Sequence, residues 1–133
     1  MKPTITVSDY TIIRSLITNL PPNHRTKEIG QLAKEIESAT KVSDEEIEVD
    51  IIRLNSYFEV EETQSKQIIK LTLTLPKQAD LTEKKISIFT PMGVALIGFK
   101  AGMLIDWVLP GGPKKLKILK VENERVLNSL ALR

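Results

Sequence analysis

The sequence predicts an α+β fold in which a short antiparallel pair of helices precedes a mostly antiparallel β domain with one short helix. Two patterns carry this prediction. Apolar residues recur every three or four positions up to about residue 40, and from about residue 50 they largely alternate with polar ones. Proline and glycine separate the segments. We expect a helical unit over residues 1–45 and a β domain over residues 46–133.

The first predicted helix follows an expected N-cap at Ser8-Asp9 and ends at Pro21-Pro22. The second runs from Thr26 to about Ala39, and Gly30 within it is expected to weaken it and to permit close helix contact. Each helix carries one apolar stripe, formed by Ile12, Ile13, Leu16, Ile17 and Leu20 in the first and by Ile29, Leu32, Ala33 and Ile36 in the second. The short proline-containing loop between them predicts an antiparallel hairpin.

The acidic run from Ser43 to Glu46 follows the helices. Its spacing is that of a capping box, with Glu46 three residues after Ser43. A calcium loop would need alternating ligands, which this run lacks. We therefore predict a cap and a solvated turn here, and neither a metal nor a cofactor.

Residues 50–62 and 66–77 are rich in β-branched side chains and predict two strands joined by a turn at 62–66. Further strands are predicted at 85–89, 104–109 and 114–123. The last alternates lysines with apolar residues imperfectly, which is typical of a half-exposed edge strand.

Turn-forming residues occur at several positions between residues 85 and 113. Thr90 and Pro91 predict a helix start, because the hydroxyl caps and proline suits the first helical position. Gly98 is expected to end that helix in a left-handed conformation, Gly102 to turn the chain, and Gly111-Gly112 to form a hairpin turn. No phosphate-loop motif is present.

Composition narrows the class of protein. The 133 residues are 41% hydrophobic and contain no cysteine, so disulfides and thiolate metal sites are excluded. The N-terminus lacks the apolar core of a signal peptide, and no apolar run reaches the roughly 18 residues of a membrane span. We expect a cytoplasmic protein without membrane contact.

The net charge of +2 is unevenly distributed. Residues 1–65 hold 7 Lys/Arg and 12 Asp/Glu, a net charge of −5, whereas residues 66–133 hold 12 Lys/Arg and 5 Asp/Glu, a net charge of +7. This polarity indicates either a charged partner or an ordinary solvated surface with chance clustering.

The segments ISIFTPMGVALIGFKAG (86–102), LIDWVLPGG (104–112) and LKILKVE (116–122) resemble, in this order, the C-terminal domain of the GreA/GreB transcript-cleavage factors. The resemblance covers residues 50–124 and implies an FKBP-like domain. The short helical hairpin (a coiled coil in this family) and VDIIRLNS (49–56) resemble the branch that regulates nucleoside diphosphate kinase. The resemblance implies binding to bacterial RNA polymerase, with the β domain at the rim of the secondary channel and the hairpin pointing inward.

Transcript cleavage in this family depends on acidic residues at the hairpin tip that help to hold Mg²⁺. The corresponding tip here carries Asn23, His24, Arg25 and Lys27, and its nearest acid is Glu28. A basic tip repels Mg²⁺. We therefore expect no cleavage activity and no catalytic residue. Arg25 and Lys27 either approach nucleic acid or an acidic surface, or only solubilise the tip.

The docking residues that the resemblance implies are Thr90, Pro91, Met92 and Gly93, which match the family's S-P-x-G segment. The alternative is that they only start the helix. Trp107 lies at a strand position typical of core packing, with a partner contact as the alternative.

Two other functions compete with polymerase binding. An FKBP-like fold suggests a prolyl isomerase, but six aromatic residues spread along the chain are few for an aromatic-lined pocket. The Lys-rich end suggests nonspecific nucleic-acid binding, but no aromatic residues lie between its lysines to stack on bases. Those lysines are Lys114, Lys115, Lys117 and Lys120.

Overall fold

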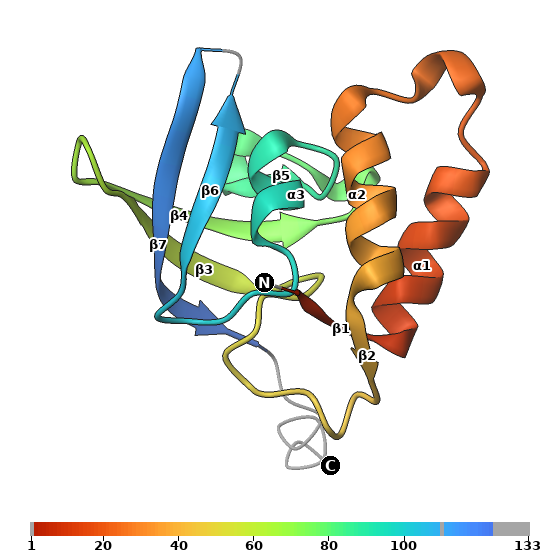
Figure 1. The fold of residues 1–133 in the computed structure, drawn as a ribbon, viewed down its shortest axis with the longest axis horizontal. Coiled ribbons are helices and arrows are strands. Elements are labelled where there is room, and N and C mark those ends of the chain that lie inside the picture. The colour runs from red at the N-terminus through yellow and green to blue at the C-terminus, as the bar shows by residue number, and fades with distance from the viewer. Residues whose placement is uncertain (1, 110, 124–133) are drawn as a thin grey trace.

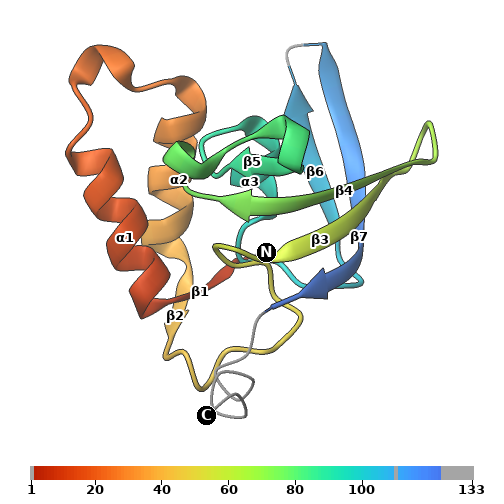
Figure 2. The ribbon, with the colours of Figure 1, turned by 180° about the vertical axis from the view of Figure 1, so that it is seen from behind.

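The computed structural model describes residues 2–109 and 111–123, and in it a curled sheet encloses one short helix while two longer helices pack at its side (Figures 1 and 2). The helices are α1 (Val7–Thr18), α2 (Lys27–Ser38) and α3 (Pro91–Leu96). The strands are β1 (Thr4–Thr6), β2 (Thr40–Val42), β3 (Tyr57–Glu62), β4 (Gln67–Thr74), β5 (Lys85–Ser87), β6 (Leu104–Leu109) and β7 (Gly112–Glu122). The prediction of a mixed α+β chain is confirmed.

Two helices of 12 residues form the amino-terminal part, as the apolar stripes predict. The N-cap of α2 is Thr26, whose hydroxyl accepts the Ile29 N–H at 3.2 Å. The predicted cap of α1 at Ser8-Asp9 is wrong. Thr6 takes that role and accepts the Asp9 N–H at 3.1 Å, because β1 ends there and leads directly into the helix.

The expected close contact at Gly30 is also wrong. Gly30 is exposed on α2, and a Cβ placed on it would meet no heavy atom within 4 Å. The apolar stripes otherwise face the interior. Ile13 and Ile17 of α1 and Ile29, Leu32 and Ile36 of α2 are buried, whereas Ile12 lies on the outer side of α1.

The five-stranded sheet has the order β5-β4-β3-β7-β6, and the turn predicted at 62–66 joins β3 to β4 in antiparallel register. Two pairings are parallel, β4 with β5 and β1 with β2. The strand predicted over 50–62 is shorter than expected. Residues 53–56 form a turn because the Arg53 N–H donates to the Ser56 hydroxyl at 2.6 Å and the Ser56 N–H donates to the Arg53 carbonyl at 3.0 Å.

The strand predicted as an edge strand, β7, lies inside the sheet between β3 and β6, so this prediction is wrong. Its imperfect alternation has another cause. The register against β3 shifts between Glu59 and Val60, which pair with Lys120 and Ile118, so Leu119 is an extra residue. One face of β7 is exposed because the outer surface of the sheet is solvated.

The predicted turns occur where the glycines lie. Gly98, Gly102 and Gly112 have positive φ angles of 87°, 94° and 124°.

The acidic run from Ser43 to Glu46 forms a turn. Glu46 accepts the Ser43 N–H and hydroxyl at 3.2 and 3.0 Å, and these bonds lower the pKa of the Glu46 carboxyl. They close a turn, and no helix follows. Pro110, which precedes the predicted turn at Gly111-Gly112, and residues 124–133 lie outside the described residues.

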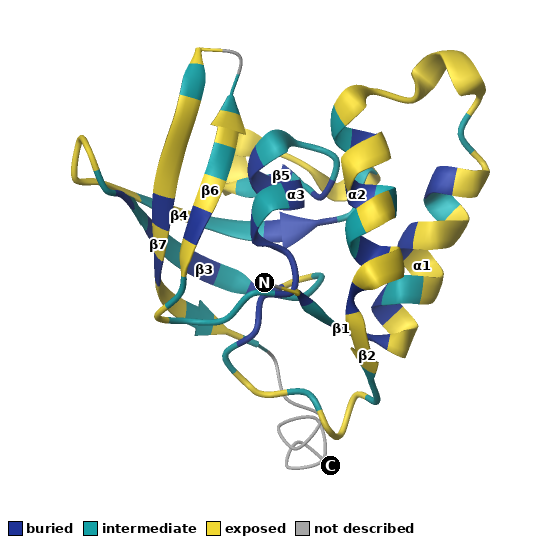
Figure 3. Cartoon of the chain, viewed as in Figure 1, coloured by how far each residue is buried: buried dark blue, intermediate teal, exposed yellow. Residues whose placement is uncertain are grey.

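One apolar cluster joins the helices to the sheet (Figure 3). Leu32 of α2, Leu96 of α3 and Phe58 of β3 are fully buried members of it. Helix α2 lies between α1 and α3, so it contacts both the outer helix and the β domain (Figures 1 and 2). None of the described helices is long and apolar enough to cross a membrane.

Candidate functional site

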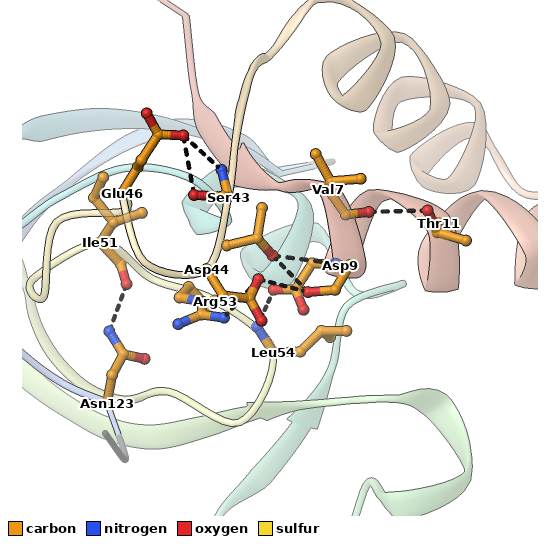
Figure 4. Close-up of polar contacts among 12 residues, drawn as sticks. Val7, Asp9, Thr11, Ser43, Asp44, Glu46, Ile51, Arg53, Leu54 and Asn123 are labelled. Carbon is orange, nitrogen blue, oxygen red and sulfur yellow. Dashed lines mark hydrogen bonds and ion pairs between the residues drawn. The ribbon is translucent and has the colours of Figure 1, made fainter. Parts of the chain in front are cut away.

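A polar junction fixes the start of α1 to the loop before β3 (Figure 4). The Asp9 carboxylate accepts the Leu54 N–H at 3.1 Å, and Asp9 is buried. Beside it, Asp44 accepts the Ser8 hydroxyl at 2.9 Å and lies 3.8 Å from the Arg53 guanidinium. These bonds hold the helix pair in a defined orientation relative to the β domain.

Burial is the main influence on the Asp9 carboxyl in this junction. It raises the pKa of Asp9 above 3.8, because a charged group loses solvation in the interior. The hydrogen bond from Leu54 and the positive charge of Arg53 act in the opposite direction, and the negative charge of Asp44 adds to the rise. We assign the junction a structural role, since its bonds tie the start of α1 to the loop before β3.

The predicted docking residues lie at the start of α3. Thr90 caps this helix by accepting the Gly93 N–H at 3.1 Å and donates its own hydroxyl to the Ser87 carbonyl at 2.7 Å. Thr90 and Pro91 are partly exposed, but Met92 and Gly93 are buried. A Cβ on Gly93 would lie 2.5 Å from the Ser87 carbonyl oxygen. A partner would therefore reach Thr90 and Pro91, while Met92 and Gly93 shape the turn.

Pro91 also lines a groove of about 650 Å³ between α2, α3 and β6. Its apolar surface comes from Val94 of α3, from Phe99 and from β6, where Leu104 and Val108 are 49% and 69% exposed. Strand β6 is the last strand of the sheet, and residues from both of its faces line the groove. The groove therefore follows the open edge of the sheet.

The opposite wall of the groove is polar and comes from α2. It consists of Lys27, Glu28, Gln31 and Glu35, and Gln31 donates to the Glu35 carboxylate at 2.7 Å. Across the groove, Asp106 of β6 is paired with Lys115 at 2.7 Å. The acidic character of this wall therefore comes from Glu28 and Glu35. The sequence did not predict this groove, because one wall comes from α2 and the other from residues 91–109, far away in the chain.

All four predicted tip residues are exposed: Asn23, His24 and Arg25 lie in the loop between α1 and α2, and Lys27 is the first residue of α2. Arg25 turns back and donates to the Ile17 carbonyl at 3.1 Å, where it caps the end of α1. Lys27 lines the groove. Glu28, the acid nearest to the tip, also lines the groove.

The predicted lysine stripe on β7 is largely matched by acids. Lys114 lies 3.9 Å from Glu62, Lys115 is 2.7 Å from Asp106, and Lys120 is 3.6 Å from Glu122. Lys117 is in register with Glu61 of β3. This pairing reduces the positive potential of the stripe, so the geometry does not favour the nucleic-acid alternative.

The described residues place few aromatic side chains at the groove and no cluster of metal ligands anywhere among them. Phe99 is the one aromatic side chain among the residues that line the groove. Trp107 packs against the core, half-buried, and its indole N–H is buried without a hydrogen-bond partner among the described residues. Within residues 2–109 and 111–123, no group of three or more His, Asp or Glu side chains is placed to hold a metal ion.

Comparison with known proteins gives a consistent result. A family model described as "Transcription elongation factor, GreA/GreB, C-term" matches residues 46–123. A transcription elongation factor GreA from Alkaliphilus oremlandii is 32% identical over 93 residues, which are 70% of this chain and 58% of that protein. This chain therefore spans less than two thirds of that relative.

Two further relatives match over nearly their whole length. A regulator of nucleoside diphosphate kinase from Escherichia coli K12 is 29% identical over 123 residues, which are 91% of this chain and 90% of that protein. The structure titled "Prokaryotic transcription elongation factor GreA/GreB from Nitrosomonas europaea" is 31% identical, with a TM-score of 0.75. That match covers 92% of this chain and 99% of the other. The relatives carry the names of transcription factors and regulators, and none of these names is that of an enzyme.

Proposed function

We propose, given that this chain belongs to the GreA/GreB family of transcription factors, that it binds bacterial RNA polymerase and regulates transcription without cleaving the transcript. The observation that carries this proposal is the full-length likeness to a transcription elongation factor of the family, at 31% identity and a TM-score of 0.75. The likeness includes the helix pair as well as the sheet, since it covers 92% of this chain.

In this proposal the chain consists of a helical unit over residues 1–45 and an FKBP-like domain over residues 46–133. The β domain docks at the rim of the secondary channel, and the helix pair points inward. Thr90 and Pro91 supply part of the docking surface, because they are partly exposed at a rigid, capped turn. Pro91 also faces the groove, so a partner seated there would touch both features.

The absence of cleavage follows from the tip. Mg²⁺ requires oxygen ligands, and carboxylates supply them best. The tip exposes Asn23, His24 and Lys27, while the carboxylate of Glu28 lies on the groove. We therefore propose that the protein occupies the channel as a competitor of cleavage factors and adds no metal ligand to the polymerase active site.

A binding competition tests this proposal. Core RNA polymerase is immobilised and the protein is added at micromolar concentration, alone and with increasing GreA. We expect saturable binding that GreA displaces. Pro91→Asp should weaken binding, because it places a solvated charge at the docking turn. Pro76→Asp is the matched control, since Pro76 begins a short 3-10 turn, Pro76–Gln78, outside the groove and should bind like the unchanged protein.

The same complexes test the second half of the proposal. Stalled elongation complexes are incubated with Mg²⁺ and either GreA or this protein, and the RNA lengths are measured. We expect shortened RNA with GreA alone. Shortened RNA with this protein would show that it cleaves, and a lack of binding at micromolar concentration would overturn the polymerase proposal altogether.

A further inference from the structure

The groove described above has one wall that the β domain does not provide. Its apolar floor comes from α3, Phe99 and β6, but its polar wall is α2, which belongs to the helix pair. Glu28 and Glu35 are partly buried on this wall, whereas most of the neighbouring residues on the outer side of α2 are exposed. A segment that enters the groove would therefore meet apolar side chains on one side and two carboxylates on the other.

The charges on the groove favour one kind of occupant. Asp106 is paired with Lys115 at 2.7 Å, so among the described residues Glu28 and Glu35 are the acids on the groove without a lysine or arginine partner at that distance, and Lys27 at the end of the wall offsets part of their charge. On the other side, Leu104 and Val108 expose 49% and 69% of their surface. Apolar side chains flanked by lysine or arginine complement this arrangement.

We propose that Glu28 and Glu35 make the helix pair part of the docking groove and select a polymerase segment in which lysine or arginine flanks apolar side chains. The inference rests on the proposed function, because it assigns the contact to the polymerase. It differs from docking through the β domain alone, since it gives α2 a direct role in choosing the partner segment.

The test compares two double variants that change the net charge equally. Glu28→Lys with Glu35→Lys reverses the charge of the wall. Glu45→Lys with Glu83→Lys makes the same change at exposed positions outside the groove. We expect the wall variant to bind immobilised core polymerase about tenfold more weakly than the unchanged protein in 50 mM salt. The control variant should stay within about twofold.

Salt dependence separates an electrostatic role from a folding defect. The affinity of the unchanged protein should fall between 50 and 300 mM salt, because ions screen contacts at the surface. Glu28→Gln with Glu35→Gln should bind more weakly at 50 mM and lose most of this dependence, while its melting temperature stays unchanged. A misfolded variant would instead bind weakly at every salt concentration and melt at a lower temperature.

Each outcome decides between the two proposals. Equal binding by the wall and control variants would overturn the inference about α2 and leave polymerase binding intact. Failure of the unchanged protein to bind would overturn the proposed function and this inference with it. Selective loss by the wall variant, with a reduced salt dependence, would support both.

Discussion

Gly98 is a residue at which the amino-terminal strand packs directly against the backbone of the β domain. Its φ angle is +87°, and its carbonyl accepts the Thr4 N–H at 2.8 Å. A Cβ at this position would lie 2.4 Å from the Cβ of Pro3. We expect Gly98→Ala to lower the free energy of unfolding by about 2–4 kcal/mol, through backbone strain and the displacement of β1.

Gly30→Ala is the control for this prediction, measured in the same urea titration. Gly30 lies within α2, where an added Cβ meets nothing within 4 Å. Alanine has the higher helix propensity, so Gly30→Ala should raise the free energy of unfolding by about 0.5–1 kcal/mol. Equal effects at the two glycines would contradict this account of Gly98.

Asp9 makes the stability of the protein depend on pH. Burial raises the pKa of its carboxyl above 3.8, so the folded state binds a proton more readily than the unfolded state. The contribution of the protonated Asp9 carboxyl to the free energy of unfolding is fully present below pH 3.8. It is lost as pH rises through the pKa of the folded state. Asp9→Asn keeps an oxygen for the Leu54 N–H and is neutral at every pH, so it should be at least as stable as the unchanged protein at pH 7.

The pH series gives the test of this prediction. The free energy of unfolding of Asp9→Asn, relative to the unchanged protein, should rise between pH 4 and pH 7. Parallel curves for the two proteins would rule out the assigned shift. Asp9→Ala leaves the Leu54 N–H without its partner and should cost about 1–3 kcal/mol, which shows that the bond itself matters.

At the scale of the element, α3 depends on its cap. It is six residues long, and the Thr90 hydroxyl satisfies the Gly93 N–H. Thr90→Ala should lower the free energy of unfolding by about 1 kcal/mol, whereas Thr90→Ser keeps the hydroxyl and should cost only a few tenths. If the cap also forms the docking turn, polymerase binding should fall with alanine and be retained with serine. Loss of binding in both variants would instead indicate a contact from the threonine methyl group.

The sequence predicted most elements because local patterns determine them. The stripes of α1 and α2, the cap at Thr90 and the positive φ of Gly98 follow from neighbouring residues alone. The place of β7 in the sheet does not. The alternation of lysines with apolar residues along β7 indicates that one face of the strand is exposed. The pairing of β7 with both β3 and β6 depends on the whole sheet.

The candidate site shows the same limit. The sequence indicated the Thr90–Pro91 turn, but it placed Met92 and Gly93 beside them without revealing that both are buried. It gave no sign of the groove, whose two walls come from residues 27–35 and residues 91–109. The sequence identifies Glu28 only as the acid nearest to the tip, because its contact with the groove depends on how α2 packs against α3.

At the scale of the whole molecule, the helix pair and the β domain share one apolar core, and this leads to a prediction about cooperativity. Hydrogen bonds cross the boundary between residues 45 and 46, including Thr4 to Gly98 at 2.8 Å and Leu54 to Asp9 at 3.1 Å. We expect a single thermal transition in calorimetry, with equal calorimetric and van't Hoff enthalpies.

A chain that begins at residue 46 would expose apolar surface that the helix pair covers, including Ile97 beside Ile36 of α2, and would lose the contact of β1 at Gly98. We expect it to melt at a lower temperature than the full chain or to aggregate. Two separate transitions in the full chain would mean that the helix pair is only loosely attached. A partner in the groove would then not contact α2 and β6 in a fixed arrangement. The calorimetric measurement therefore also tests whether the two walls of the groove form one binding site.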